Sequence, residues 1–516
     1  MTNTNLSRRG VLAGTGALAT SSLAPAMADG TLLLKTRSSL DVAVLDPPNR
    51  ISVTDGDVMR AIFSGLVRLK PGTWDWEKDL AVSIEQSDPT HIKFQLRPGV
   101  PWTNGFGEVT AEDVKFSYER YIDPNFKAAY RTDWETLDRV DITDSHSGVI
   151  VLKRPFVPLW ASTLPAASGM IVCKRAVEAL DGKRFTMEPP ATNGAYRIKK
   201  LEPRRSITLE RNPLWPGKRP AFDEVQYIQI VDANAAEIAF AAGEVDFTQL
   251  PLASIARVKK SPPPHSKLSV QPALAYWWLG MQSEVGVFSD IRVRRAVQYA
   301  VEVDTVLEGA FFGAAERATG IIAPGLPGHR PGNKIEKPDP DKARDLLKQA
   351  GHPNGFKTTI GVRNSAEFVN AAQIVAASLA TVGITAEVIP MDAGAQRAMA
   401  IDKNGAWKQM GLHIVRFTMQ PDPSWATAWF VTSQIGEWNW ERFSNAEFDK
   451  LDVEAKSELD PSKRAAMYVR MQDLMEESGS YVFLTHGSVA SIYRDTIKPA
   501  LSPDGQFQLF NDFTPA

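Results

Sequence analysis

Hydrophobic side chains recur along this chain at two spacings, which predict strands and helices in turn. Ile92, Phe94 and Leu96 alternate with polar neighbours, and this period of two is typical of a half-buried strand. Two more short apolar runs also predict strands, over residues 31–36 and 384–389.

A spacing of three to four residues predicts amphipathic helices in several segments. One helix is expected to begin at Thr110, because Asp113 stands three residues on and completes a capping box with Asp in place of Glu. Its inward stripe is Val114, Tyr118, Tyr121 and Ile122. A further helix is predicted over 57–70, running into a strand-like run at 65–69. Three more are predicted over 293–301, from Asp339-Pro340 to Gly351, and over 371–382. The last is expected to begin after Ser444, with Glu447 as the other member of its capping pair. Helices that alternate with short strands indicate mixed α/β lobes.

The first residues form a pattern of their own. Ser7-Arg8-Arg9-Gly10 is a twin-arginine motif, a short apolar run follows, and Ala26-Met27-Ala28 offers the small residues that a signal peptidase recognises. The apolar run is too short to span a bilayer, which disfavours a membrane anchor, and no lipobox cysteine follows it. Residues 1–28 are therefore predicted to be a twin-arginine signal peptide, and the mature protein to be periplasmic.

Composition changes the picture in two ways. The chain has 516 residues, of which 43% are hydrophobic and 23% charged, and this is ordinary for a soluble globular protein too long for one core. Its net charge of −2 gives no general attraction to nucleic acid, so no nucleic-acid partner is expected.

Signatures of catalysis and of metal binding are absent. The seven histidines have no ligand spacing, the single cysteine, Cys173, excludes an intramolecular disulfide, and there is no nucleophile elbow, P-loop or H-E-x-x-H motif. We therefore predict no catalytic residue, no metal site and no cofactor, and a protein that is not an enzyme.

Several short runs together resemble the family 5 extracellular solute-binding proteins, which are the peptide, nickel and opine binders of ABC importers. Leu96-Arg97-Pro98-Gly99-Val100 and Thr192-Asn193-Gly194-Ala195-Tyr196 are two of these runs. The others are 45–47, 62–67, 110–117, 209–213, 222–225, 242–246, 288–296 and 446–451, with Trp102. They occur in the family's order over nearly the whole mature chain.

The resemblance implies an α/β fold, a two-lobe periplasmic-binding-protein clamshell with an extra inserted subdomain. The first lobe would take residues 29–48, 191–275 and 487–516, the inserted subdomain 49–190, and the second lobe 276–486. The hinge would lie near 272–279 and 486–489. The resemblance also implies a monomer that closes around a small-molecule or peptide ligand and delivers it to an ABC permease and its ATPases in the inner membrane.

The segment from His413 to Trp425 is the richest candidate for the cleft. It is predicted to be a buried strand that leaves the core at two prolines, where α/β sheets present ligand-contacting groups. In the peptide binders of this family the segment carries an acidic residue for the ligand's ammonium, with a tryptophan three positions before it. When the alignment is anchored on Asp422, these positions fall on Met419 and Arg416.

This departure shifts the expected ligand. A guanidinium at Arg416 suits a carboxylate, phosphate or sulfate, so we expect an anionic or zwitterionic solute, such as an opine or a sugar phosphate. A di- or oligopeptide is the main competitor. Two alternatives stay open: Asp422 takes the acidic role if the alignment slips, or Arg416 pairs with a neighbouring acid.

Aromatic side chains supply the other candidates for the ligand site. Five of the thirteen tryptophans fall within 407–440, an excess that fits either lobe packing or an aromatic pocket. We expect Trp425, Trp438 and Trp440 near the cleft, and either Trp277 or the pair Tyr276 and Trp278 on the strand face that lines it. His413 would suit a metal chelate, although a lone histidine is more often a packed core residue.

Two other classes of protein compete with the binding protein. A periplasmic enzyme would need a nucleophile and base that converge in the cleft, and a chaperone-like module would need an exposed apolar groove.

Overall fold

The computed structural model describes residues 27, 28, 30–401 and 405–516. The twin-arginine pair and the apolar run of the predicted signal peptide lie outside the described residues. Met27 and Ala28, the last residues of that prediction, form the short strand β1 (Met27–Ala28), which pairs with β2 (Thr31–Ser38).

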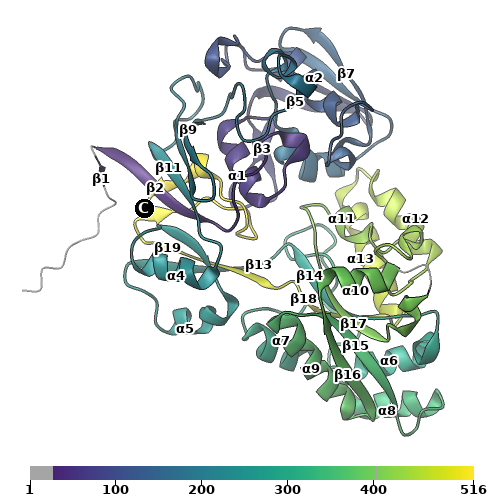
Figure 1. Cartoon of the computed structure of the whole chain (residues 1–516). Coiled ribbons are helices and arrows are strands. Elements are labelled where there is room, and N and C mark those ends of the chain that lie inside the picture. The colour runs from purple at the N-terminus through teal and green to yellow at the C-terminus, as the bar shows by residue number, and fades with distance from the viewer. Residues whose placement is uncertain (1–26, 29, 402–404) are drawn as a thin grey trace, which may run out of the picture.

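An eight-stranded mixed sheet forms the first structural unit, which we call the large-sheet unit (Figure 1). β2 runs parallel to β11 and β12, and the other pairings are antiparallel. Along the sheet the strands are β13 (Ser266–Pro272), β19 (Ser488–Arg494), β12 (Phe247–Leu250), β2, β11 (Glu224–Gln229), β10 (Ser206–Arg211) and β9 (Tyr196–Glu202), and the eighth strand, β1, pairs with β2 outside this order. Helix α1 (Val53–Ile62) packs into one hydrophobic core of this sheet, and α4 (Ala233–Ala241) and α5 (Ile255–Lys260) pack into another.

A four-stranded antiparallel sheet forms the second unit, which we call the four-stranded unit. Its order is β5 (Ala81–Asp88), β6 (His91–Leu96), β8 (Ser147–Leu152) and β7 (Leu137–Asp144), and α2 (Ala111–Ile122) packs on it. The hairpin of β3 (Val67–Leu69) and β4 (Trp76–Lys78) and helix α3 (Lys174–Glu178) lie nearby in the chain.

A five-stranded sheet forms the third unit, which we call the five-stranded unit. Its order is β16 (Ile384–Met391), β15 (Phe356–Arg363), β17 (Leu412–Thr418), β14 (Ala275–Met281) and β18 (Tyr481–Thr485). One core contains α6 (Ile291–Ala300), α7 (Val303–Phe311), α8 (Pro340–Gln349) and α9 (Ala366–Ala380), and the core on the other side contains α10 (Ala393–Ile401), α11 (Ser424–Thr427), α12 (Ala446–Ala455) and α13 (Pro461–Glu477). A short pair, β20 (Ile497–Lys498) and β21 (Thr514–Pro515), ends the chain.

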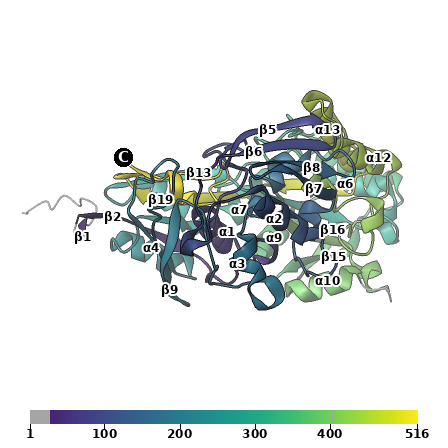
Figure 2. The ribbon, with the colours of Figure 1, turned by 90° about the horizontal axis from the view of Figure 1, so that it is seen from above.

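The chain passes between the large sheet and the five-stranded sheet twice, through residues 273–274 and 486–487 (Figure 1). The two connections touch, because the Ala273 amide donates to the Gly487 carbonyl at 3.3 Å and His486 Nδ1 donates to the Ala275 carbonyl at 2.7 Å. Seen from above, the four-stranded sheet overlies the five-stranded unit (Figure 2). The two also touch, since the Val157 amide donates to the Lys456 carbonyl at 2.9 Å.

Most of the predicted elements are confirmed. Strands occur at 31–38, 91–96 and 384–391, and helices at 291–300, 340–349 and 366–380. The predicted capping box is present at the start of α2, where Asp113 accepts from the Thr110 amide at 2.9 Å. Three of the four residues of its stripe are buried, and Ile122 is half-buried.

Two helix predictions were wrong at their starting points. The helix expected over 57–70 is α1, which begins at Val53 because Ser52 and Asp55 form their own capping box, and it ends at Ile62. The cap of α12 is Asn445, whose side chain accepts from the Phe448 amide at 3.0 Å, and not Ser444. In both helices the first turn begins after a polar residue whose side chain accepts a hydrogen bond from the backbone amide three residues further on, and this cap sets the start of the helix.

Gly194 is expected to be a sensitive position, because the backbone at the end of α1 presses against it. A Cβ there would lie 2.5 Å from the Ala61 carbonyl oxygen, and the Gly194 amide donates to the Ile62 carbonyl at 2.8 Å. Gly194→Ala should therefore lower the free energy of unfolding by about 1–3 kcal/mol in urea titrations. Gly332→Ala is the control, since no atom lies within 4 Å of its Cβ position and it should change little. Equal stability of the two variants would contradict the close packing.

Candidate functional site

A cavity of about 340 Å³ opens between the units and is the candidate ligand site. One side is lined by residues between Arg50 and Arg60, by the loop around Pro165 and by the segment from Asp504 to Phe507. The other side is the end of β17 and the turn after it, and Ala273 and Leu274 of the first connection complete the lining. Its volume is at the small end of the range for small-molecule sites, about 300–1,000 Å³.

The charged groups that line this cavity are unequal in sign. They are three arginines and one aspartate: Arg50, Arg60, Arg416 and Asp504. Arg50 is compensated, since Nη1 donates to Ser168 Oγ at 2.8 Å and Nη2 lies 3.4 Å from Asp133 Oδ2. The remaining excess of positive charge favours an anionic guest.

Arg416, predicted from the sequence, lies in the lining on β17 opposite Trp277 of β14. Its half-buried guanidinium forms no hydrogen bond or ion pair with another described residue. Burial lowers the pKa of Arg416, the like charge of Arg363 lowers it further, and Glu367 opposes both. The side chain is therefore a partly desolvated cation in the cavity with no hydrogen-bonded counter-ion.

Met419 also lines the cavity and is buried, and its amide donates to the Leu274 carbonyl at 3.0 Å. This contact fastens the turn after β17 to the connection between the sheets. A thioether at this position offers no charge to a ligand's ammonium group.

Asp422 lies outside the lining, and Arg464 of α13 occupies its carboxylate. Arg464 Nη2 donates to both carboxylate oxygens at 2.9 Å, and the Ser424 amide donates to Oδ1 at the same distance. Both charged residues are buried. Asp422 therefore anchors the turn after β17 to α13 and has no free charge for a ligand.

The aromatic residues of β14 belong to the cores on the two faces of the sheet and do not line the cavity. Tyr276 and Trp278 face one core, where Trp278 Nε1 donates to Glu441 Oε1 at 2.6 Å. Trp277 faces the other, with its ring 4.2 Å from that of Phe368. The predicted sharing of faces is present, but none of these three side chains lines the cavity.

His413 is fully buried beside the same glutamate, with Nε2 2.7 Å from Glu441 Oε1. Gly280 leaves the room for this pair, because a Cβ there would clash with both side chains. In the part of the chain that the structure describes, no group of three or more His, Cys, Asp or Glu residues is arranged to hold a metal ion. The pair thus lies in the packed interior of the five-stranded unit.

The three other predicted tryptophans also lie outside the lining. Trp425 Nε1 donates to Ser162 Oγ at 3.3 Å, a contact between the five-stranded unit and the loop beside the cavity. Trp438 packs edge-on against Trp429, and Trp440 is buried with Nε1 donating to the Glu437 carbonyl at 3.1 Å. The tryptophan excess is therefore mostly packing within one unit.

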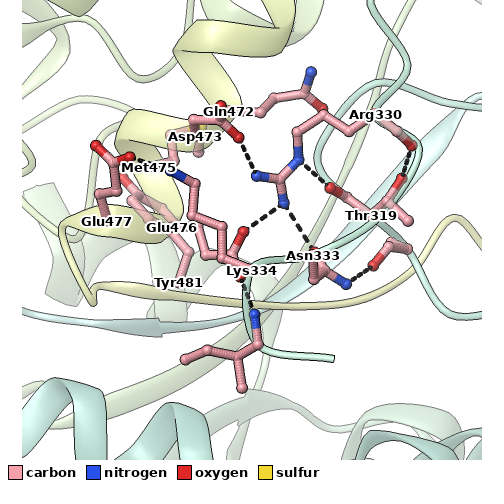
Figure 3. Close-up of polar contacts among 12 residues, drawn as sticks. Thr319, Arg330, Asn333, Lys334, Gln472, Asp473, Met475, Glu476, Glu477 and Tyr481 are labelled. Atoms are coloured by element: carbon pink, nitrogen blue, oxygen red, sulfur yellow. Dashed lines mark hydrogen bonds and ion pairs between the residues drawn. The ribbon is translucent and has the colours of Figure 1, made fainter. Parts of the chain in front are cut away.

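A buried arginine with a hydrogen-bond acceptor for each of its guanidinium nitrogens shows by contrast what Arg416 lacks (Figure 3). Arg330 donates to Asp473 and Asn333 at 2.8 Å each and to the Thr319 carbonyl, and it forms an ion pair with Glu476 at 2.7 Å. These contacts hold the 319–333 loop against α13. Each nitrogen of this guanidinium thus has a partner within the protein.

Sequence reasoning missed three charged residues of the lining: Arg50, Arg60 and Asp504. They come from segments more than 400 residues apart, and no local pattern relates them. Arg50 precedes the start of α1 and Arg60 lies in its last turn. The sequence prediction had placed the start of this helix four residues too late, at residue 57.

None of the helices in the described part of the chain has the length and apolar composition needed to cross a membrane.

Comparisons with known proteins agree with this architecture. The family model described as bacterial extracellular solute-binding proteins, family 5 Middle, matches residues 75–437. The glutathione-binding protein GsiB of Shigella dysenteriae is 25% identical over 464 residues, which are 87% of this chain and 88% of that protein.

Two solved structures share the fold. HbpA2 from Haemophilus parasuis superposes with a TM-score of 0.82 at 19% identity, over 94% of this chain and 100% of that one. MoaA from A. tumefaciens R10, in complex with mannopinic acid, gives 0.72 at 24% identity, over 94% and 99%. These likenesses confirm the predicted mixed α/β fold of the periplasmic binding proteins. Since the family model covers well over half of the chain, the protein belongs to family 5 of the bacterial extracellular solute-binding proteins.

Proposed function

We propose that this protein is the periplasmic binding component of an ABC importer and that it captures a small anionic or zwitterionic solute. The observation that carries the choice of solute is Arg416, a cation in the cavity lining without a hydrogen-bonded or ion-paired partner among the described residues. An oxyanion would supply the missing acceptors in the planar geometry that a guanidinium prefers.

The mechanism follows from the position of the cavity. Its lining comes from the large-sheet and four-stranded segments on one side and from the five-stranded unit on the other. A solute that contacts both sides stabilises the arrangement in which they are close, and so shifts the population toward closure. An inner-membrane permease and its ATPases would then recognise the loaded form of a monomeric protein.

We also propose the division into lobes that the sequence suggested. The first lobe comprises 29–48, 191–275 and 487–516, the inserted subdomain 49–190, and the second lobe 276–486. The membership of the three main sheets supports it, because each sheet draws its strands from one of these sets apart from β1 and the first residue of β14. Export through the twin-arginine pathway, with residues 1–28 removed, belongs to the same proposal.

A peptide remains the competing solute, and an enzyme the competing class. The cavity lining has no carboxylate where peptide binders of the family hold the ammonium group, because Met419 occupies that position and Asp422 is bound to Arg464. The lining contains a serine, Ser52, whose side chain caps α1, and it contains no His, Cys, Lys or Glu.

The deciding experiment identifies the solute that the purified protein retains, by native mass spectrometry, and then titrates it by calorimetry. Arg416→Gln should weaken its binding by about 10- to 100-fold, which is the range for a lost charge-assisted hydrogen bond. Arg344→Gln, at a half-exposed arginine of α8 outside the cavity, is the matched control and should bind normally. Tight binding of free dipeptides that Arg416→Gln leaves unchanged would overturn the anion assignment.

A further inference from the structure

We propose that Arg60 of α1 is a second anion-binding residue of the cleft, and that the solute therefore carries two anionic groups, one bound from each side of the cavity. This inference rests on the proposed solute-binding function and names the chemical class of the solute.

The hydrogen bonding of Arg60 is incomplete. Arg60 lines the cavity, but its Nε and Nη1 are enclosed by protein and have no hydrogen-bond partner among the described residues. The nearest carboxylate oxygen, Asp57 Oδ1, is 3.7 Å from Nη1, which is beyond hydrogen-bond distance. Buried N–H groups without acceptors are unfavourable, and Nη2 is the nitrogen of this guanidinium that remains open to a carboxylate at the cavity wall.

The neighbouring acids compensate this charge only in part. Asp57 is fully buried, and burial raises its pKa to about 7, while the Tyr227 hydroxyl donates to Oδ2 at 3.0 Å. Burial also raises the pKa of Asp504, the other acid near Arg60. Because Asp57 is partly protonated near neutral pH, the guanidinium keeps an excess of positive charge for a guest.

The position of the side chain is fixed by its surroundings. The guanidinium stacks over the ring of Phe507, another lining residue, with 4.3 Å between the guanidinium carbon and the ring centroid. The backbone carbonyl of Arg60 accepts from Asn511 Nδ2 at 3.1 Å, which ties the last turn of α1 to the C-terminal segment. Arg60 is therefore preorganised at the cavity wall.

The two arginines face the same space from different units. Arg60 belongs to α1, beside the large sheet, and Arg416 belongs to β17 of the five-stranded sheet. Repulsion between these like charges, which Asp57 and Asp504 compensate only in part, disfavours closure of an empty cleft. A solute with two anionic groups replaces this repulsion by two attractions and makes closure depend on the solute.

The test uses linear dicarboxylates from succinate to pimelate, each paired with the monocarboxylate of the same chain length. Purified protein freed of retained solute is titrated by calorimetry. At least one dicarboxylate should bind about tenfold or more tightly than its monocarboxylate. Arg60→Gln and Arg416→Gln should each reduce that ratio to about one, whereas Arg60→Lys, which keeps the charge, should retain part of it.

Arg205→Gln, at an exposed arginine of the β9–β10 turn, is the matched control and should keep the full ratio. Thermal unfolding of each variant shows whether it is folded, and Arg60→Lys preserves the test if Arg60→Gln is not. A ratio near one in the unaltered protein, or a ratio that Arg60→Gln leaves unchanged, would overturn the proposal. If the protein binds dipeptides and shows no preference for dicarboxylates, the two-anion proposal fails and the solute-binding function stands. If it binds neither dipeptides nor dicarboxylates, the result counts against both the two-anion proposal and the solute-binding function.

Discussion

Replacing Asp422 by alanine is expected to lower the free energy of unfolding by about 3–5 kcal/mol, the usual loss when one partner of a buried ion pair is removed. The guanidinium of Arg464 would remain buried without its carboxylate, and its Nη2 would keep the Tyr468 hydroxyl as its acceptor but lose both Asp422 oxygens. The turn after β17 would also lose the cap that Asp422 provides to Ser424. Urea titration followed by tryptophan fluorescence measures the change.

Two comparisons make this expectation specific. Asp341→Ala removes an exposed aspartate, which pairs with Arg344 at the surface, and should cost about 0–1 kcal/mol. The double variant Asp422→Asn with Arg464→Met removes both charges and should recover part of the loss. A cost for Asp422→Ala as small as that of Asp341→Ala would show that the pair does not hold this turn.

Stability should also depend on pH through His486, which lies at the second connection between the sheets. Burial lowers its pKa from 6.5 to about 4, although Nδ1 donates to the Ala275 carbonyl. Above pH 6.5 the residue is neutral in both the folded and unfolded states and has no effect. Below that, the unfolded chain binds a proton that the folded chain does not bind until about pH 4, so stability falls over this window by about 3 kcal/mol.

The measurement is the difference in unfolding free energy between the unaltered protein and His486→Asn at several pH values from 7.5 to 4. Asparagine keeps an N–H donor near Nδ1 but does not titrate, so the variant should lose less stability on acidification. His265→Asn, at an exposed position, should leave the pH dependence unchanged. Parallel curves for the unaltered protein and His486→Asn would show that His486 does not titrate as proposed.

The sequence by itself determined the local elements and the family. The alternation at Ile92, Phe94 and Leu96 and the capping box at Thr110 are local patterns, and the structure contains both elements. The ordered motifs identified family 5 because each of them is a contiguous run. The start of α1 was misplaced although its capping box, Ser52 with Asp55, is also local.

Only the tertiary structure decided which candidate residues meet the cavity. Of ten side chains expected there, Arg416 and Met419 line it, while Asp422, His413 and the aromatic residues have partners elsewhere. A strand pattern indicates which side chains share a face, but it does not indicate what covers that face. Arg60 and Asp504 both line the cavity because α1 packs against the C-terminal segment. Contacts between segments so far apart in the sequence depend on the whole fold.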